Sequence, residues 1–143
     1  MESTSTSASR LSVMAEPAGY ATMRPMSTTV LIVDDHAPFR SFARALLQAE
    51  GYHVVGEAGD GATALREFRR LHPDVVLLDI QLPDIDGFEV LRQLAAEANG
   101  TAVVLTSSRD ASDYRRRLAG STARGFIAKS SLSGATLAAI LGA

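Results

Sequence analysis

The chain has 143 residues, of which 46% are hydrophobic and 21% charged, an ordinary balance for one globular domain and too short a chain for two. The formal net charge is −2, so no basic surface for nucleic acid is predicted, and no cysteine is present to form a disulfide or supply a thiolate. Apolar runs of about four to six residues are too short for a membrane span or a signal peptide. A cytoplasmic globular protein is the resulting prediction.

Residues 1–28 form a predicted disordered extension. They are rich in Ser and Thr, include Pro17, Gly19 and Pro25, and show no apolar periodicity. Such a segment buries too little apolar surface to offset the entropy of ordering it. We therefore expect one folded domain over residues 29–143.

From Thr29 onward, short apolar runs alternate with amphipathic segments. The runs are typical of strands buried on both faces, and the amphipathic segments of helices. This alternation favours right-handed crossovers, hence an α/β fold in which helices cover both faces of a parallel (βα)5 sheet. The predicted strands are Val30–Val33, His53–Ala58, Val75–Leu78, Ala102–Leu105 and Gly125–Ala128. The predicted helices are Ala37–Gln48, Gly61–Leu71, Gly87–Ala96, Asp110–Ala119 and Leu132–Leu141.

Chemically versatile side chains follow four of the predicted strands. Asp34 and Asp35 follow the first strand, Asp79 the third, Thr106 the fourth and Lys129 the fifth. Because ligands of open α/β sheets bind beside the carboxyl ends of the strands, these side chains are expected to meet at one edge. Lys129 is also the only lysine among 14 basic residues, which indicates a need for a compact ammonium group.

Three neighbouring carboxylates repel one another unless a cation lies between them. Mg²⁺ suits such a site, because it prefers oxygen ligands and usually keeps several waters. Asp34 and Asp35 can also be interpreted as turn and helix-cap residues. Asp79 favours the metal site, since it ends an apolar run and is followed by a loop where no capping role is evident.

Two other groups of charged residues have simpler interpretations. Asp84 and Asp86 lie between Pro83 and the next predicted helix, so we expect loop and helix-cap roles rather than metal binding. The run Arg115–Arg117 occupies successive helical positions about 100° apart, which indicates a solvated surface rather than one phosphate-binding stripe.

A carboxylate beside Mg²⁺, with an ammonium and a hydroxyl opposite, suits an aspartyl nucleophile for phosphoryl transfer. In this hypothesis Lys129 neutralises charge on the phosphoryl oxygens, and the Thr106 hydroxyl donates a hydrogen bond to one of them. A strand-end threonine and a lysine that extends to solvent are each common by themselves. Their joint order with the aspartates is what favours the hypothesis.

Residues 29–141 resemble the receiver domain of two-component response regulators. The segments that carry the resemblance are Val30–His36, Asp74–Gly87, Val103–Ser108 and Gly125–Lys129. The resemblance implies a flavodoxin-like, doubly wound sheet with strand order 2-1-3-4-5. It also implies a phosphorelay protein whose Asp79 takes a phosphoryl group from the phosphohistidine of a histidine kinase or phosphotransfer protein.

The resemblance further implies how the metal is held. Asp35, Asp79 and the carbonyl of Gln81 bind Mg²⁺ directly, and Asp34 acts through a water. Thr106 and Lys129 complete the reactive site in this assignment.

The resemblance also implies a switch rather than an enzyme. Phe126 matches an aromatic residue whose rotamer reports phosphorylation, although it lacks a tyrosine hydroxyl. The face around the fourth helix, the fifth strand and the fifth helix is expected to bind a downstream protein. We expect a monomer or weak dimer without an output domain, and therefore no direct binding of nucleic acid. The short apolar runs argue against a membrane partner.

Other functions have specific objections. A hydrolase of the haloacid dehalogenase kind needs an acid two residues after its aspartyl nucleophile, where Gln81 stands, and a cap domain. A flavodoxin needs a hydroxyl- and Gly-rich phosphate loop, where Asp34, Asp35 and His36 stand. The remaining alternative is a degenerate receiver that binds partners without phosphorylation, against which the full set of site residues argues.

Overall fold

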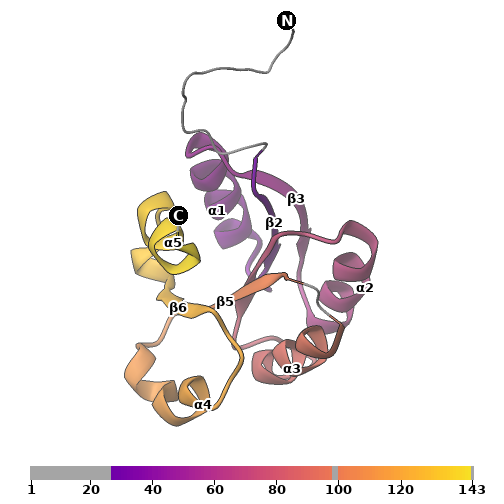
Figure 1. Cartoon of the computed structure of the whole chain (residues 1–143), viewed down its shortest axis with the longest axis vertical. Helices are drawn as coiled ribbons and strands as arrows, with labels where there is room; N and C mark the ends of the chain where they lie inside the picture. The colour runs from indigo at the N-terminus through magenta and orange to yellow at the C-terminus, as the bar shows by residue number, and fades with distance from the viewer. Residues whose placement is uncertain (1–26, 98–99, 143) are drawn as a thin grey trace, which may run out of the picture.

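The structure, a computed structural model, describes residues 27–97 and 100–142. Five parallel strands form a central sheet with helices on both faces (Figure 1). The strands are β2 Thr29–Val33, β3 His53–Ala58, β4 Val75–Asp79, β5 Ala102–Ser107 and β6 Gly125–Ala128. The α-helices are α1 Ala37–Ala49, α2 Gly61–Leu71, α3 Gly87–Glu97, α4 Arg115–Ala119 and α5 Gly134–Leu141, and the 3-10 helices are η1 Ala111–Tyr114 and η2 Lys129–Ser131.

The strand order across the sheet is β3-β2-β4-β5-β6, which is 2-1-3-4-5 along the chain. This order confirms the predicted flavodoxin-like fold. β2 pairs with β3 on one side and with β4 on the other. The connections that leave β2 and β3 therefore run in opposite directions across the sheet. A crevice is expected at this reversal, beside the carboxyl ends of β2 and β4, where Asp34 and Asp79 lie.

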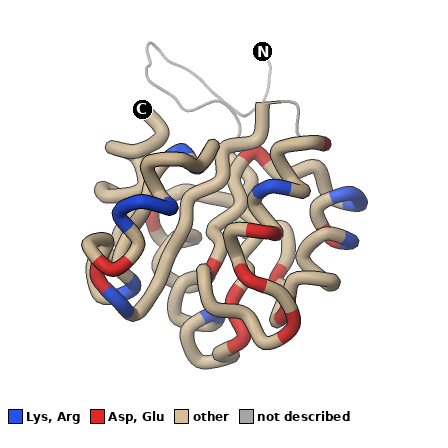
Figure 2. Tube along the Cα trace, turned by 90° about the horizontal axis from the view of Figure 1, so that it is seen from below, with Lys and Arg blue, Asp and Glu red and all other residues tan. Residues whose placement is uncertain are grey.

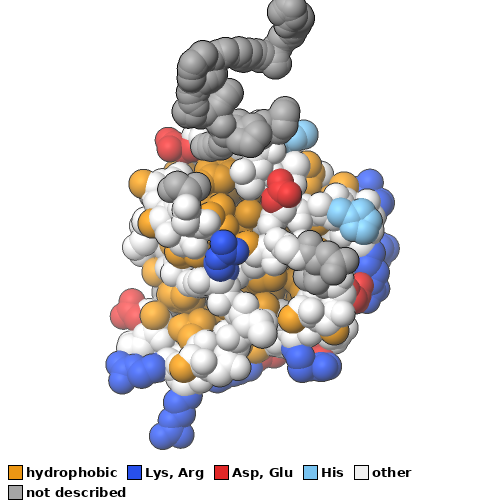
Figure 3. Space-filling view, in the orientation of Figure 1, with side chains coloured by type: hydrophobic (Ala, Val, Ile, Leu, Met, Phe, Trp, Pro, Cys, Tyr) orange, Lys and Arg blue, Asp and Glu red, His pale blue; other side chains and the backbone are white. Residues whose placement is uncertain are grey.

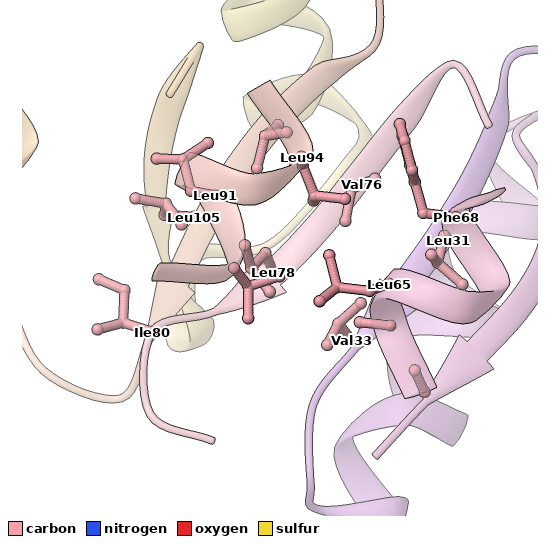
Figure 4. Packing of buried hydrophobic residues seen from close by; sticks show 14 of the residues in the cluster. Leu31, Val33, Leu65, Phe68, Val76, Leu78, Ile80, Leu91, Leu94 and Leu105 are labelled. Atoms are coloured by element: carbon pink, nitrogen blue, oxygen red, sulfur yellow. The ribbon is translucent and has the colours of Figure 1, made fainter. Parts of the chain in front are cut away.

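Two apolar layers enclose the sheet, because successive strand residues point to opposite faces. One layer lies beneath α1 and α5, and the other beneath α2, α3 and η1. The first includes Val30, Ile32, Leu47, Leu77, Val104 and Leu137. The second includes Leu31, Val33, Leu65, Phe68, Val76, Leu78, Leu91, Leu94 and Leu105 (Figure 4). Strands buried on both faces provide a rigid base for the residues at their ends.

Two strands extend further at their carboxyl ends than predicted. β4 includes Asp79 and β5 continues through Thr106 to Ser107, so these residues belong to the strands rather than to the following loops. Asp79 and Thr106 are partners in the parallel register. The pairing holds the backbone of both residues in place.

The predicted helix Asp110–Ala119 is interrupted in the structure. Its first part is the 3-10 helix η1, and only the short segment after Tyr114 is α-helical. Tyr114 has φ −125° and ψ 14°, outside helical geometry, and its side chain is buried in the core. Burial of this ring accompanies the break between the two short helices.

The last helix begins later than predicted. It starts at Gly134 instead of Leu132, because the Ser133 side chain accepts a hydrogen bond from Thr136 N and forms a capping box there. The preceding residues Lys129–Ser131 form η2.

The predicted N-terminal extension lies almost entirely outside the described residues, so its disorder stays a prediction. Thr28 is described, and its carbonyl accepts a hydrogen bond from His53 N at 2.9 Å, one residue before the expected domain boundary. None of the helices in the described part of the chain has the length and apolar character needed to cross a bilayer.

Candidate functional site

Lys129 joins two buried carboxylates at the carboxyl ends of the strands. Asp34 follows β2 and is fully buried, and Asp79 ends β4 with 2% exposure. Lys129 Nζ lies 2.6 Å from Asp34 Oδ2 and 3.2 Å from Asp79 Oδ2. The structure therefore brings together three of the residues that the sequence analysis selected, although they come from separate strands.

The backbone of Asp34 is held from several sides. Its N–H donates to Ala58 O at 2.9 Å, and its carbonyl accepts from Arg40 Nη1 at 2.6 Å. Arg40 Nε also donates to Glu57 Oε1 at 3.0 Å, so this guanidinium ties α1 and β3 to the site. Arg40 could not be selected from the sequence, because only the tertiary fold shows which residues its side chain reaches.

The two oxygens of the Asp34 carboxylate have different partners. Oδ1 accepts from His36 N at 2.8 Å, a local turn contact, and His36 rather than Asp34 is the N-cap of α1. Oδ2 is buried and lies 2.6 Å from Lys129 Nζ, so the ammonium is its partner. A buried carboxylate oxygen of this kind is costly unless a cation is nearby.

The donor atoms around this oxygen suit a cation. Ligand atoms of Asp34, Asp35, His36 and Asp79 all lie within 4.8 Å of one another. Three of the four are carboxylates, which are the ligands that Mg²⁺ prefers. The residues present therefore fit the metal that the sequence predicts.

His36 contributes more to the site than the sequence indicated. Its Nδ1 lies 3.1 Å from Asp34 Oδ1 and 3.1 Å from Asp35 Oδ1, while the ring remains mostly exposed. Its position directly after the acidic pair was the available signal, but the geometry was not predictable from sequence. The imidazole thus spans both carboxylates at the solvent side of the site.

The backbone around Asp79 is tightly packed. Asp79 Oδ1 accepts from Gln81 N at 3.1 Å, and Ile80 N donates to Thr106 O at 2.9 Å. A Cβ atom at Gly87 would lie 2.5 Å from Asp79 O and 2.6 Å from Ile80 Cα. Only glycine therefore allows the start of α3 to approach the strand end this closely.

The surroundings of the site stabilise the charged form of Lys129 and disfavour the charged form of Asp79. Burial raises the pKa of Asp79, the charge of Asp34 raises it further, and the contacts with Gln81 N and Lys129 offset only part of this. Burial opposes the charge of Lys129, but its contacts with Asp34 and Asp79 outweigh this and raise its pKa. The ammonium is therefore the stable form in the resting protein.

The other residues predicted from the sequence lie on β5 and β6 and in the loop after β4. Thr106 is buried on β5 opposite Asp79, Gln81 is exposed in the loop after β4, and Phe126 is half-buried on β6. Thr106 is therefore adjacent to the candidate nucleophile. The role of the Gln81 carbonyl in metal binding stays a prediction.

Asp86 makes the helix-cap contact that the sequence predicts, whereas Asp84 also makes an unpredicted contact with another helix. Asp86 Oδ1 accepts from Phe88 N at 2.7 Å at the start of α3. Asp84 instead reaches α2, where its two oxygens accept from Gly61 N at 2.8 Å and Ala62 N at 3.0 Å. The loop after Asp79 is therefore anchored to a neighbouring helix.

Phe39 is another residue that the sequence analysis did not connect to the site. Its ring centroid lies 4.9 Å from Lys129 Nζ. The attraction between a cation and an aromatic face helps to hold the ammonium. Several acidic segments lie close together in the lower middle of the tube view (Figure 2). Lys129 contacts two of the site carboxylates.

Comparison with known families gives a direct match. The family model described as "Response regulator receiver domain" matches residues 30–141 of this chain. The chain belongs to the response regulator receiver domain family. Receiver domains of two-component systems interact with histidine kinases and usually act as phosphorylation switches rather than as catalysts. The pocket of Asp34, Asp35, Asp79 and Lys129 is consistent with the phosphoacceptor site of such a domain, and its acidic cluster is typical of a receiver Mg²⁺ site.

Similar proteins include larger regulators. A putative transcriptional regulator of Pseudomonas aeruginosa is 40% identical over 100 residues, which cover 70% of this chain and 48% of the relative. The probable transcriptional regulatory protein TcrX of Mycobacterium tuberculosis is 42% identical over 97 residues, which cover 68% of this chain and 40% of the relative. The receiver domain thus spans about half the length of these curated relatives or less.

A solved structure has the same fold. The signal receiver domain of the putative response regulator NarL from Mycobacterium tuberculosis is 34% identical, with a TM-score of 0.70. The match covers 83% of this chain and 100% of that chain. The receiver fold therefore extends over nearly all the described residues.

Proposed function

We propose that this receiver domain is a phosphoacceptor in a two-component phosphorelay and that Asp79 accepts the phosphoryl group. The observation that carries the proposal is the bridging contact of Lys129 with Asp79 and Asp34 at the carboxyl ends of the strands. A buried carboxylate beside a compact ammonium can receive a charged group and have the added charge neutralised.

The donor that we propose is the phosphohistidine of a histidine kinase or phosphotransfer protein. A carboxylate oxygen of Asp79 attacks phosphorus, the P–N bond breaks, and an acyl phosphate forms. The imidazole leaves as a neutral ring whose other nitrogen carries a proton. Lys129 and the Thr106 hydroxyl face the transferred group, one as a cation and the other as a hydrogen-bond donor.

Asp34, Asp35, Asp79 and the Gln81 carbonyl would hold Mg²⁺, with Asp34 acting through a water. When bound, the metal supplies positive charge against the phosphoryl oxygens. Support for this ligand set is the closeness of the Asp34, Asp35 and Asp79 carboxylates.

The output that we propose is a downstream cytoplasmic protein that binds the face of α4, β6 and α5. Attraction of the phosphoryl group to Lys129 and Thr106 draws the ends of β5 and β6 toward the site and leaves space for Phe126 to turn inward. Basic side chains project from the region of α4 (Figure 3), where Arg115 and Arg116 are exposed. This surface is distinct from the acidic site.

The test is incubation with a small phosphodonor and Mg²⁺, followed by intact mass measurement. The wild type is expected to gain one phosphoryl group, and Asp79→Asn is expected to gain none. Asp113→Asn, an exposed carboxylate of η1, is the matched control and should label normally. If Asp79→Asn labels at the wild-type rate, the assignment is wrong. If the wild type does not label, the alternative of phosphorylation-independent binding is favoured.

A further inference from the structure

Tyr114 connects the end of β5 to the surface at η1 and α4. Its side chain is 8% exposed, and its hydroxyl lies 3.2 Å from the buried Ser107 Oγ. Ser107 Oγ also accepts from Arg109 N at 3.0 Å. Since Ser107 directly follows Thr106, the Tyr114 hydroxyl holds the chain next to the proposed phosphoryl site.

The ring of Tyr114 lies on the same face of the sheet as Phe126. Leu105 and Phe126 are register partners, and Ser107 points to the same face as Leu105 because it lies two residues further along β5. The ring centroid of Tyr114 is 6.4 Å from that of Phe126. Tyr114 therefore covers the sheet between Phe126 and the end of β5.

Tyr114 is also tied to the outer surface. It is the last residue of η1 and directly precedes α4, and its ring centroid is 6.2 Å from that of Phe88. Arg117 of α4 lies over the Phe88 ring at 4.2 Å and forms an ion pair with Asp86 at 2.9 Å. A displacement of Tyr114 would therefore disturb both α4 and its contact with the start of α3.

We propose that Tyr114 is the positioning residue that couples the state of the phosphoryl site to the η1–α4 surface. Its hydroxyl bond to Ser107 holds the Thr106 end of β5 and the η1–α4 segment in the resting arrangement. A phosphoryl group on Asp79 draws Thr106 toward it, shifts Ser107 and weakens this bond, so that Tyr114 and α4 rearrange together. This inference rests on the proposed function and adds to it the residue that transmits the signal.

The experiment compares amide chemical shifts of wild type, Tyr114→Phe and Ser107→Ala, each with and without beryllium trifluoride and Mg²⁺ as the phosphoryl mimic. Tyr114→Phe removes only the hydroxyl and keeps the buried ring. Tyr52→Phe is the matched control, because Tyr52 is a buried tyrosine of the opposite core layer. Labelling of every variant by a small phosphodonor is measured in parallel.

Without the mimic, Tyr114→Phe and Ser107→Ala are expected to move the amides of residues 111–119 along the direction that the mimic produces in the wild type. Loss of one ordinary hydrogen bond corresponds to a change of about fivefold in the ratio of the two arrangements. The double variant should show no shift beyond that of Ser107→Ala, because that substitution already removes the partner of the Tyr114 hydroxyl and also the acceptor of Arg109 N. Tyr52→Phe should leave these amides unchanged.

The coupling proposal is overturned if Tyr114→Phe has wild-type resting shifts at residues 111–119 and the full response to the mimic. It is also overturned if Tyr52→Phe produces the same displacement. Either result, with normal labelling of the wild type, leaves the phosphoacceptor function standing. Failure of the wild type to label refutes the phosphoacceptor function instead.

Discussion

Lys129 is closer to Asp34 than to Asp79: its Nζ atom lies 2.6 Å from Asp34 Oδ2 and 3.2 Å from Asp79 Oδ2. The lysine thus remains paired when Asp79 is neutralised, and a phosphoryl group on Asp79 must compete with Asp34 for the ammonium. The consequences of this shared contact are measurable.

Asp79→Asn is expected to raise the melting temperature at neutral pH, by about 2–5 °C. Burial raises the pKa of Asp79, so the folded protein binds this proton more readily than the unfolded chain does. Protonated Asp79 therefore favours the folded state at low pH, and this contribution to stability is lost as the pH rises through the pKa of Asp79 in the folded protein. Thermal unfolding should therefore show the advantage of Asp79→Asn shrinking as the pH falls toward the ordinary aspartate value of 3.8. An advantage that grows in acid would contradict this.

Lys129→Met is expected to destabilise the protein by about 1–3 kcal/mol, because it leaves two carboxylates without their shared cation; partial exposure of the lysine limits the effect. Phosphodonor labelling should slow on the order of 100-fold. Lys129→Arg keeps the charge, but a planar guanidinium cannot replace a compact ammonium between the carboxylates, so labelling should still be impaired. Chemical denaturation and labelling rates test both effects, with the exposed Arg66→Lys as control. Normal labelling of Lys129→Arg would show that the ammonium shape is unimportant.

Asp35→Asn is expected to abolish the Mg²⁺ dependence of labelling. It should also raise the thermal stability of the metal-free protein slightly, because it removes one of three mutually repelling carboxylates. A Mg²⁺ titration monitored by melting temperature tests the binding without relying on phosphorylation. Asp110→Asn, an exposed carboxylate outside the cluster of ligand atoms, should retain the wild-type titration. An unchanged titration in Asp35→Asn would exclude Asp35 as a ligand.

Thr106→Ala is expected to permit labelling and to reduce the structural response. Thr106 is the register partner of Asp79 on the neighbouring strand, so we expect its hydroxyl to turn toward a phosphoryl group on Asp79. Amide shifts between residues 110 and 128, measured with and without the mimic, are the readout. A full response would show that the signal leaves the site by another route.

Gly87→Ala is expected to destabilise the protein by about 1–3 kcal/mol, because the added methyl group would overlap the backbone of Asp79 and Ile80. Labelling should slow as well, since the strand end must move. Gly120→Ala is the control: the nearest atom to its added Cβ is Arg116 O at 3.7 Å, an ordinary contact. Denaturation curves for the two variants should therefore differ clearly.

Sequence alone determined the alternation of strands and helices, and with it the positions of Asp34, Asp79, Thr106 and Lys129 at or beside strand ends. These features depend on local periodicity and on the rule that parallel strands present their carboxyl ends at one edge. The resemblance to receiver domains supplied the strand order, which the structure confirms.

Tertiary structure decided which side chains meet. The contact of Lys129 with Asp34, the hydrogen bonds from the start of α2 to Asp84 and the burial of Tyr114 against Ser107 join segments that are separate in the chain. Burial of Tyr114 also accompanied the break in the predicted helix Asp110–Ala119, which local pattern had treated as continuous. Such contacts depend on how whole elements pack, and packing between distant segments has no local periodic signal in the sequence.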